Sequence, residues 1–376
     1  MQFPLIPQDA TQVVLWGGLV LGFALGAIAQ VSRFCTMGAL ADWFAYRGTR
    51  RLMTWVLAVL VAAVGALVLV AFGLLDATQT LAWSPRLLWL SYLVGGTLFG
   101  FGMVLASGCP QRNLVRLGSG SLKALVVLLV AGLTAQMTLR GVLSEVRVNW
   151  LEPASLMLAG PQDAGSLLAH GVGGSAAILR WAVLAAILAL AAPWGWKHRH
   201  SMDPGQWLAG AGIGLLVVMA WWLTGHLGYI PEHPETLEAV WAGTYSHRPE
   251  AFTFVAPLAH SLDLLTLWTD RNTVLSYGVM VTLGTVLGSA ALALARHEFR
   301  VESFHNARDL GQHLLGGALM GFGGVTAMGC SIGQGLSGLS LLSAGAFLAV
   351  AGIVFGTWLA LHFQTWQMTR DDRRAS

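Results

Sequence analysis

Two segments of the chain decide its fold, because one repeats the other: Leu93–Cys109 reads LVGGTLFGFGMVLASGC, and Leu314–Cys330 reads LLGGALMGFGGVTAMGC. At a fixed offset of 221 residues, 11 of the 17 aligned positions are identical without a gap. Both copies end on a cysteine, and the chain has only three cysteines. Gly-rich apolar segments share some identities through composition alone, but an ungapped run that ends on so rare a residue is not explained this way. We therefore predict an internal repeat.

The composition around the repeat is that of a membrane protein. Of the 376 residues, 55% are hydrophobic and 10% are charged, and the mean hydropathy is +0.65. Soluble domains carry about 25% charged residues, so a soluble globule is excluded. The 21 Lys and Arg residues lie in short loops and form no basic face, which argues against nucleic-acid binding. We expect an all-α polytopic protein, with a single transmembrane domain over residues 1–376 in contact with the lipid bilayer.

Apolar stretches of about 20 residues are long enough to cross a bilayer as helices. The first stretch is expected to be retained, because residues 1–12 lack the Lys and Arg residues of a cleaved signal peptide. The sequence predicts nine spans, near residues 13–31, 52–75, 87–106, 122–143, 174–194, 206–228, 272–295, 310–328 and 341–363.

The distribution of basic residues predicts the orientation. Loops that follow odd-numbered spans, with their flanks, hold 15 of the 21 Lys and Arg residues. Cytoplasmic loops are the ones enriched in these residues. The protein is therefore expected in the inner membrane of a bacterium, with its N-terminus outside and its C-terminus in the cytoplasm.

The two copies of the repeat lie five spans apart, in span three and span eight. An odd displacement inverts the second copy relative to the membrane. We expect two inverted halves, residues 13–143 and 206–363, related by a pseudo-twofold axis and joined by a connector at residues 174–205. Gly22 and Gly26 in the first half correspond weakly to Gly210 and Gly214 in the second. Transporters built in this way bind their substrates near the midplane, where broken helices from the two halves meet.

Each copy of the repeat is followed by a polar, Gly-rich stretch. Irregular backbone at membrane depth is tolerated only inside protein or beside a polar cavity, so short re-entrant helices are expected. Pro110 suits the first position of a helix, which places Cys109 at a helix N-terminus. Helix N-termini offer free N–H groups and a positive dipole end to small anions. The predicted substrate-binding residues at these turns are Gly108, Cys109, Gly329, Cys330, Ser331 and Gln334.

Three cysteines spread along the chain do not suggest a disulfide framework. A thiol offers a soft sulfur and a weak S–H donor, and its neutral form suits an anion path because a thiolate would repel the ion. Cys35, in a polar break after the first span, is the third predicted substrate-binding thiol. The competing interpretation is that cysteines fill space in apolar helices, which their positions in polar or Gly-rich breaks disfavour. Two roles remain open, anion ligand or membrane anchor, for Arg33, Arg112 and Arg116.

The segment 229–271 is expected to be an external loop with a short interfacial helix. Its histidines, His233, His247 and His260, lack the close spacing of metal ligands and are interpreted as solvated. No metal, cofactor or catalytic residue is predicted anywhere in the chain.

The sequences around the cysteines carry a family resemblance. They read SRFCTMGAL (Ser32–Leu40), ASGCPQRNLVRLGSGSLKALVVLLVAG (Ala106–Gly132) and MGCSIGQGLSGLS (Met328–Ser340). In these motifs the chain resembles the YeeE/YedE family of sulfur-compound membrane transporters, and within it the thiosulfate branch. The resemblance implies an hourglass-like inner-membrane protein that imports thiosulfate along a path of cysteines, which would be Cys35, Cys109 and Cys330. It also implies that a small sulfur-carrier protein, as a separate chain, works with the transporter.

Two other functions stay open at the level of sequence. One is transport of another small sulfur or selenium anion, since a selenium-associated branch shares the Gly-Cys-Pro pattern. The other is an intramembrane sulfurtransferase that forms a cysteine persulfide. Such chemistry needs a reactive thiolate and a release route, whereas the chain has no CxxC motif and no acid or base beside its cysteines.

Overall fold

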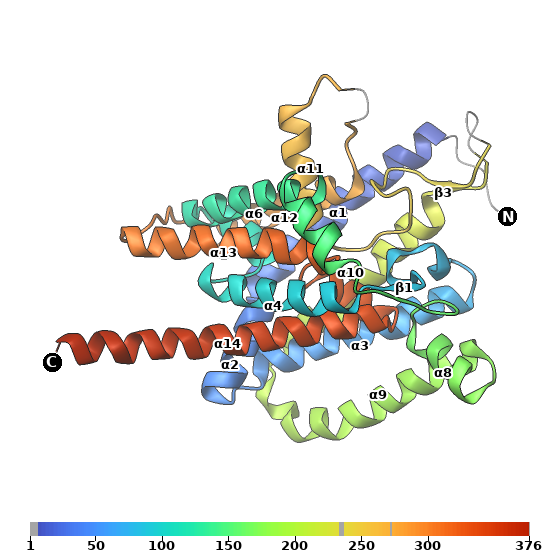
Figure 1. The fold of residues 1–376 in the computed structure, drawn as a ribbon, viewed down its shortest axis with the longest axis horizontal. Helices are drawn as coiled ribbons and strands as arrows, with labels where there is room; N and C mark the ends of the chain where they lie inside the picture. The colour runs from blue at the N-terminus through green and yellow to red at the C-terminus, as the bar shows by residue number, and fades with distance from the viewer. Residues whose placement is uncertain (1–6, 233–236, 271–272, 376) are drawn as a thin grey trace.

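The structure is a computed structural model that describes residues 7–232, 237–270 and 273–375. Within these ranges the chain forms long helices at all nine predicted positions (Figure 1). Their bounds are α1 (Pro7–Ser32), α3 (Arg50–Ala71), α4 (Trp89–Leu105), α6 (Leu122–Arg140), α9 (Ala176–His198), α10 (Pro204–Trp222), α12 (Tyr277–Ala295), α13 (Ala307–Thr326) and α14 (Ala344–Ala375).

In the described part of the chain, eight helical segments are long and apolar enough to cross a membrane. The protein is thus an all-α, multi-pass membrane protein, as predicted. The predicted span 310–328 is not among the eight, although it forms α13. Its apolar stretch is shortened at the start by Asp309 and His313, which interact with each other and, through Asp309, with Lys123.

Short elements connect the long helices. Five are α-helices: α2 (Thr36–Tyr46), α5 (Pro110–Gly118), α7 (Leu143–Val146), α8 (Ala164–Val172) and α11 (Val255–Thr266). Three are 3-10 helices: η1 (Ala77–Gln79), η2 (Leu81–Trp83) and η4 (Arg199–Ser201). Three are π-helices: η3 (Arg147–Leu151), η5 (Leu223–Leu227) and η6 (Gly333–Gly338). Two-residue strands form two antiparallel pairs, β1 (Arg86–Leu87) with β2 (Leu156–Met157) and β3 (Tyr229–Ile230) with β4 (Val240–Trp241).

The repeated segments α4 and α13 cross each other reciprocally. A Cβ atom at Gly95 would lie 2.5 Å from the backbone nitrogen of Ala327, and one at Gly316 would lie 2.7 Å from that of Ala106. The two contacts exchange under the offset of 221 residues that relates the copies. Each helix therefore meets the other's C-terminal end, so α4 and α13 run antiparallel.

The outer partners of this pair follow the same rule. Helix α4 packs against α14, and α13 packs against α6, so each repeated helix contacts the last helix of the other predicted half. Helices α4 and α14 lie side by side in Figure 1. A second pair of contacts joins α1 to α12 and α10 to α3. There, Cβ atoms at Gly26 and Gly214 would collide with the carbonyl oxygens of Thr285 and Ala58. Close backbone approach through small residues is typical of helices packed in membranes.

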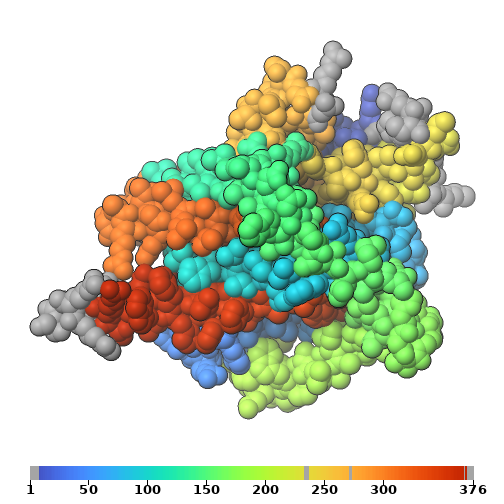
Figure 2. Space-filling view, viewed as in Figure 1, coloured from blue at the N-terminus to red at the C-terminus, as the bar shows by residue number. Residues whose placement is uncertain are grey.

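The helix of the predicted connector, α9, lies at the edge of the molecule (Figure 1). Only 6% of the most apolar 18-residue stretch of α9 is buried, compared with 44–61% of the corresponding stretches in the other seven candidate spans. Figure 1 also shows α14 extending beyond the other helices, and the space-filling view in Figure 2 shows α9 at the lower edge of the molecule. The packed core instead surrounds Cys109 and Cys330, which belong to one large apolar cluster.

Candidate functional site

Each cysteine stands at the start of a short helix. Cys35 is the N-cap of α2, and its sulfur accepts a hydrogen bond of 3.3 Å from the backbone N–H of Gly38. Cys109 is the N-cap of α5, with Pro110 at the first helical turn as the sequence predicted. Cys330 precedes η6, and its sulfur accepts a bond of 3.3 Å from the N–H of Gly333. The Cys35 and Cys330 sulfurs thus accept an N–H bond as an N-cap side chain does, whereas Cys109 occupies the N-cap position without such a bond.

The three thiols lie inside the protein and close to one another. Cys109 and Cys330 are fully buried, Cys35 is 7% exposed, and all three are free thiols. Cys109 is near enough to Cys35 and Cys330 to interact electrostatically with both, and the Ser331 side chain and the Arg112 backbone N–H face its sulfur. The fold therefore gathers three thiols from distant parts of the sequence into one cluster, which we call the thiol cluster.

The turns before Cys109 and Cys330 have the same backbone. Ser107 and Met328 have φ angles of 55° and 57°, and the glycines that follow, Gly108 and Gly329, both have φ of 157°. Left-handed backbone is uncommon for residues other than glycine, so its recurrence at equivalent positions shows that both copies make the same turn.

An amide side chain braces each of these turns. The Asn113 Nδ2 atom donates to the carbonyl oxygens of Gly108 and Cys109, at 2.9 Å and 3.2 Å. Gln334 lies four residues after Cys330, and its Nε2 atom donates to the carbonyl oxygen of Ala327 at 2.8 Å. Of the predicted site residues, Gly108, Gly329 and Gln334 thus shape the turns that carry the thiols.

Next to each cysteine in the sequence are buried polar atoms that have no hydrogen-bond partner among the described residues. They occur in Thr36 after Cys35, in Gln111, Arg112 and Asn113 after Cys109, and in Ser331 after Cys330. A buried polar group is normally paired, so these atoms mark a place for a polar ligand or water. Ser331 was predicted from the sequence, whereas Thr36, Gln111 and Asn113 were missed. Their positions in the sequence could have suggested them, since each is a polar residue within four positions of a cysteine.

One pocket, which we call the outer pocket, has a volume of about 320 Å³ and is lined in part by residues at the end of the second repeat and directly after it. These include Gly329, Gly333 and Gln334, and they face residues of the segment 229–271 that was expected to be external. Glu250 lies here, with its Oε1 atom accepting bonds from the Ser246 N–H and hydroxyl groups, and burial raises the pKa of its carboxyl group.

His260 was predicted to be solvated, but the structure shows it partly buried. The His260 ring is half-buried and stacks on Tyr245 with ring centres 3.5 Å apart. Burial lowers its pKa to about 4. His247 is exposed, as expected, and His233 lies outside the described residues. The segment folds over the outer pocket, which is why one of its histidines is withdrawn from solvent.

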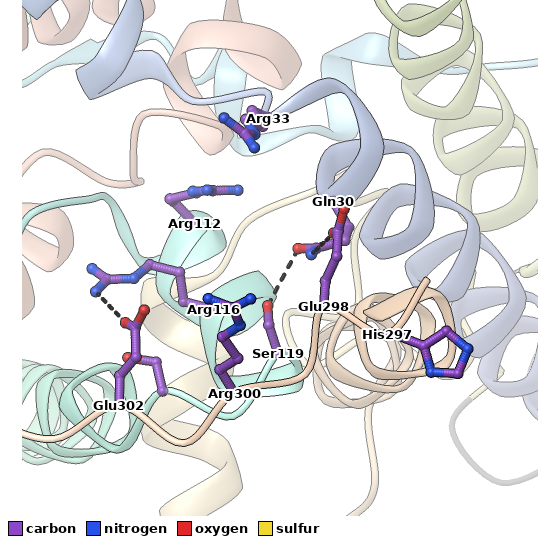
Figure 3. A pocket seen from close by; sticks show the side chains of 10 residues that line it. Gln30, Arg33, Arg112, Arg116, Ser119, His297, Glu298, Arg300 and Glu302 are labelled. Atoms are coloured by element: carbon purple, nitrogen blue, oxygen red, sulfur yellow. Dashed lines mark hydrogen bonds and ion pairs between the residues drawn. The ribbon is translucent and has the colours of Figure 1, made fainter. Parts of the chain in front are cut away.

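A second pocket of about 370 Å³, which we call the inner pocket, is lined by Arg112, three residues after Cys109 (Figure 3). Its walls come from the end of α1, from α5 and from the connection between α12 and α13. Arg33, Arg112 and Arg116, which the sequence offered as anion ligands or anchors, all line it together with Arg300. These residues belong to the loops predicted to face the cytoplasm.

Comparison with known proteins relates this arrangement to a transport family. A family profile described as sulphur transport matches residues 31–359, a range that contains all three cysteines. A thiosulfate transporter TsuA of Escherichia coli (strain K12) is 26% identical over 361 residues, covering 92% of this chain and 94% of the relative. A thiosulfate transporter TsuA of Spirochaeta thermophila is 27% identical over 356 residues, covering 92% and 97%.

Proposed function

The chain belongs to the sulphur transport family, and from this membership we propose that it imports thiosulfate across the bacterial inner membrane. Two relatives that match over nearly their whole length are named as thiosulfate transporters. The excess of Lys and Arg in alternate loops supports an orientation with the N-terminus outside and the C-terminus in the cytoplasm.

The observation that carries the proposal is the thiol cluster. In Cys35 and Cys330 the sulfur already accepts an N–H bond, which leaves the S–H group to donate to a ligand. We propose that thiosulfate passes from Cys330 through Cys109 to Cys35, with its terminal sulfur on the thiols. The neighbouring polar groups, including the Ser331 hydroxyl and the backbone around Gly108 and Gly329, would meet its oxygens.

The inverted-repeat organisation fits this path. We propose that residues 13–143 and 206–363 form the two halves and that residues 174–205 connect them. The reciprocal contacts of Gly95 and Gly316 support this division. Each half then contributes one cysteine turn at the crossing of α4 and α13, and Cys35 adds a third thiol that the second half does not match.

We propose that the ion crosses unchanged, without a catalytic step, and that a separate small sulfur-carrier protein receives it in the cytoplasm. A sulfurtransferase would instead keep a sulfur atom on a cysteine. Mass spectrometry of the protein after exposure to thiosulfate distinguishes the two, because a persistent persulfide would contradict simple transport.

Uptake of [35S]thiosulfate by a sulfur-auxotrophic host tests the proposal. We expect Cys109→Ala and Cys330→Ala each to reduce uptake to the level of cells without the transporter, because each removes one donor from the path. Thr357→Ala is the matched control, since it also shortens a small, fully buried side chain but lies in α14. Wild-type uptake by either cysteine variant, at equal amounts of protein in the membrane, would refute the relay.

A further inference from the structure

The inner pocket carries more positive charge than its acidic residues can neutralise. Four arginines line it, together with two glutamates (Figure 3). Glu302 pairs with Arg116 at 3.6 Å. Among the described residues, no ion pair with a carboxylate involves Arg33, Arg112 or Arg300. An unbalanced group of this kind attracts anions.

Arg112 is the most unusual of the four. It is half-buried, and its Nη1 atom is inaccessible to solvent and has no hydrogen-bond partner among the described residues. Apart from the thiols of Cys35 and Cys109, the side chains that interact electrostatically with Arg112 are those of Arg116 and Arg51, and both of these are cations. A buried guanidinium nitrogen without a hydrogen-bond partner is costly, so the position of the Nη1 atom points to a ligand.

Arg112 also connects the pocket with the thiol cluster. It lies three residues after Cys109 on α5, and its side chain is close enough to Cys35 and Cys109 to interact with both. Its Cγ atom packs against Gly108, where an added Cβ would lie 3.1 Å away. Arg112 is therefore within electrostatic reach of two thiols and also lines the pocket.

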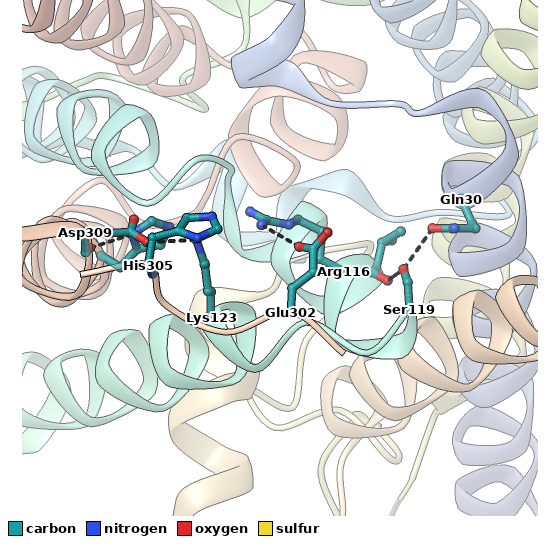
Figure 4. Close-up of polar contacts among 9 residues, drawn as sticks. Gln30, Arg116, Ser119, Lys123, Glu302, His305 and Asp309 are labelled. Carbon is teal, nitrogen blue, oxygen red and sulfur yellow. Dashed lines mark hydrogen bonds and ion pairs between the residues drawn. The ribbon is translucent and has the colours of Figure 1, made fainter. Parts of the chain in front are cut away.

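The two glutamates are held by other partners. Besides the pair between Glu302 and Arg116, Gln30 donates to Glu298 at 3.2 Å, and the Ser119 hydroxyl donates to the other end of the Gln30 amide at 3.3 Å (Figure 4). The segment that carries both glutamates is also bonded to the turn after α5. There the backbone N–H of Arg300 donates to the Ser119 carbonyl oxygen at 3.0 Å. Among the described residues, neither carboxylate forms an ion pair with Arg112.

We propose that the inner pocket is a second binding site for a doubly charged sulfur oxyanion, with Arg112 as its principal ligand and Arg33 and Arg300 as supporting charges. The site rests on the proposed function, because thiosulfate is the ion that would arrive there from the thiol cluster. It differs from that cluster in chemistry. Guanidinium groups bind the oxygens of an anion through charge-assisted hydrogen bonds, so this site would also accept sulfate.

Binding of [35S]thiosulfate to the purified full chain, in a variant with all three cysteines changed to alanine, isolates this site. We expect the triple variant to bind thiosulfate in competition with sulfate. Adding Arg112→Gln should weaken binding roughly 10- to 100-fold, which is the loss expected for one charge-assisted contact, and Arg112→Lys should restore part of it. Arg296→Gln is the matched control, since it removes an exposed arginine from the same connection outside the pocket.

The outcomes separate this inference from the proposed function. Equal affinities for the Arg112→Gln and Arg296→Gln variants would overturn the second site, even if the cysteine variants stop uptake as proposed. A large loss with Arg112→Gln would support the site, even if the cysteine variants still transport. If the triple variant does not elute as a monodisperse protein, the same comparison is made in the Cys330→Ala single variant.

Discussion

The turn that ends in Cys109 and the turn that ends in Cys330 share one backbone but lead into different side chains. Both contain a left-handed residue and then a glycine with φ of 157°. Three residues after the cysteine, however, the first copy has Arg112 and the second has Gly333. Arg112 lines the inner pocket, whereas Gly333 lines the outer one.

This difference shows how a symmetric scaffold serves an asymmetric task. The backbone makes the same turn before the cysteine in both copies of the repeat. At Gly333 an added Cβ would lie 2.9 Å from the Thr253 hydroxyl oxygen, so the outer turn has little room for a side chain. At the equivalent position of the inner turn, Arg112 provides a charge. We infer that a thiol is common to both turns and that an arginine three residues after it belongs to the first turn only.

The largest expected effect tests the shared backbone. Gly95→Ala and Gly316→Ala should each destabilise the protein by about 1–3 kcal/mol, the usual cost of overpacking, because each added Cβ meets a backbone atom of the opposite helix. Thermal unfolding of the purified protein measures this loss. Gly195→Ala in α9, where nothing lies within 4 Å of an added Cβ, is the control and should be neutral or slightly stabilising. A marked loss at only one of the two positions would break the comparison.

A smaller effect should distinguish the braces of the two turns. Asn113 donates to two carbonyl oxygens and is fully buried, whereas Gln334 donates to one and is 8% exposed. Each lost bond leaves a buried carbonyl group underbonded, so we expect Asn113→Ala to cost about 1–2 kcal/mol and Gln334→Ala about half as much. The reverse order in thermal unfolding would mean that the braces are not equivalent parts of the two turns.

The smallest effect concerns pH at the outer pocket. Burial lowers the pKa of His260 to about 4, so its ring is neutral at and above its ordinary pKa of 6.5. We therefore expect the pH profile of uptake by the His260→Gln variant to follow that of the wild type from about pH 6 to pH 8. Since the folded pKa is depressed, any stability linked to this ring is present above pH 6.5 and declines as the pH falls toward 4. A shifted uptake profile near neutral pH would show that His260 titrates in the path.

The sequence predicted the large features of the fold because they depend on simple patterns. The nine helices follow from apolar stretches, and the antiparallel crossing of α4 and α13 follows from the repeat and its odd displacement. Pro110 correctly indicated that a helix begins after Cys109. The low apolarity of α13 was visible in Asp309 and His313, but their contacts with each other and with Lys123 were not.

The candidate site was predictable only in part. Three cysteines in polar breaks led to the prediction of a thiol path, but the sequence did not indicate that the Cys35 and Cys330 sulfurs each accept a backbone N–H bond. The buried, unpaired atoms of Thr36, Gln111 and Asn113 depend on tertiary packing, which no local pattern encodes. For the same reason, the sequence could not decide whether Arg112 anchors the protein at the membrane or faces an anion, whereas the inner pocket favours the second role.

The central claim is that thiosulfate crosses this protein through the thiol cluster. The most direct test is the rate at which liposomes that contain the purified chain take up [35S]thiosulfate, with the wild type and the Cys330→Ala variant at equal protein content. We predict rapid uptake by the wild type and, for the variant, the rate of protein-free liposomes. Equal rates for the wild type and the variant would contradict the claim.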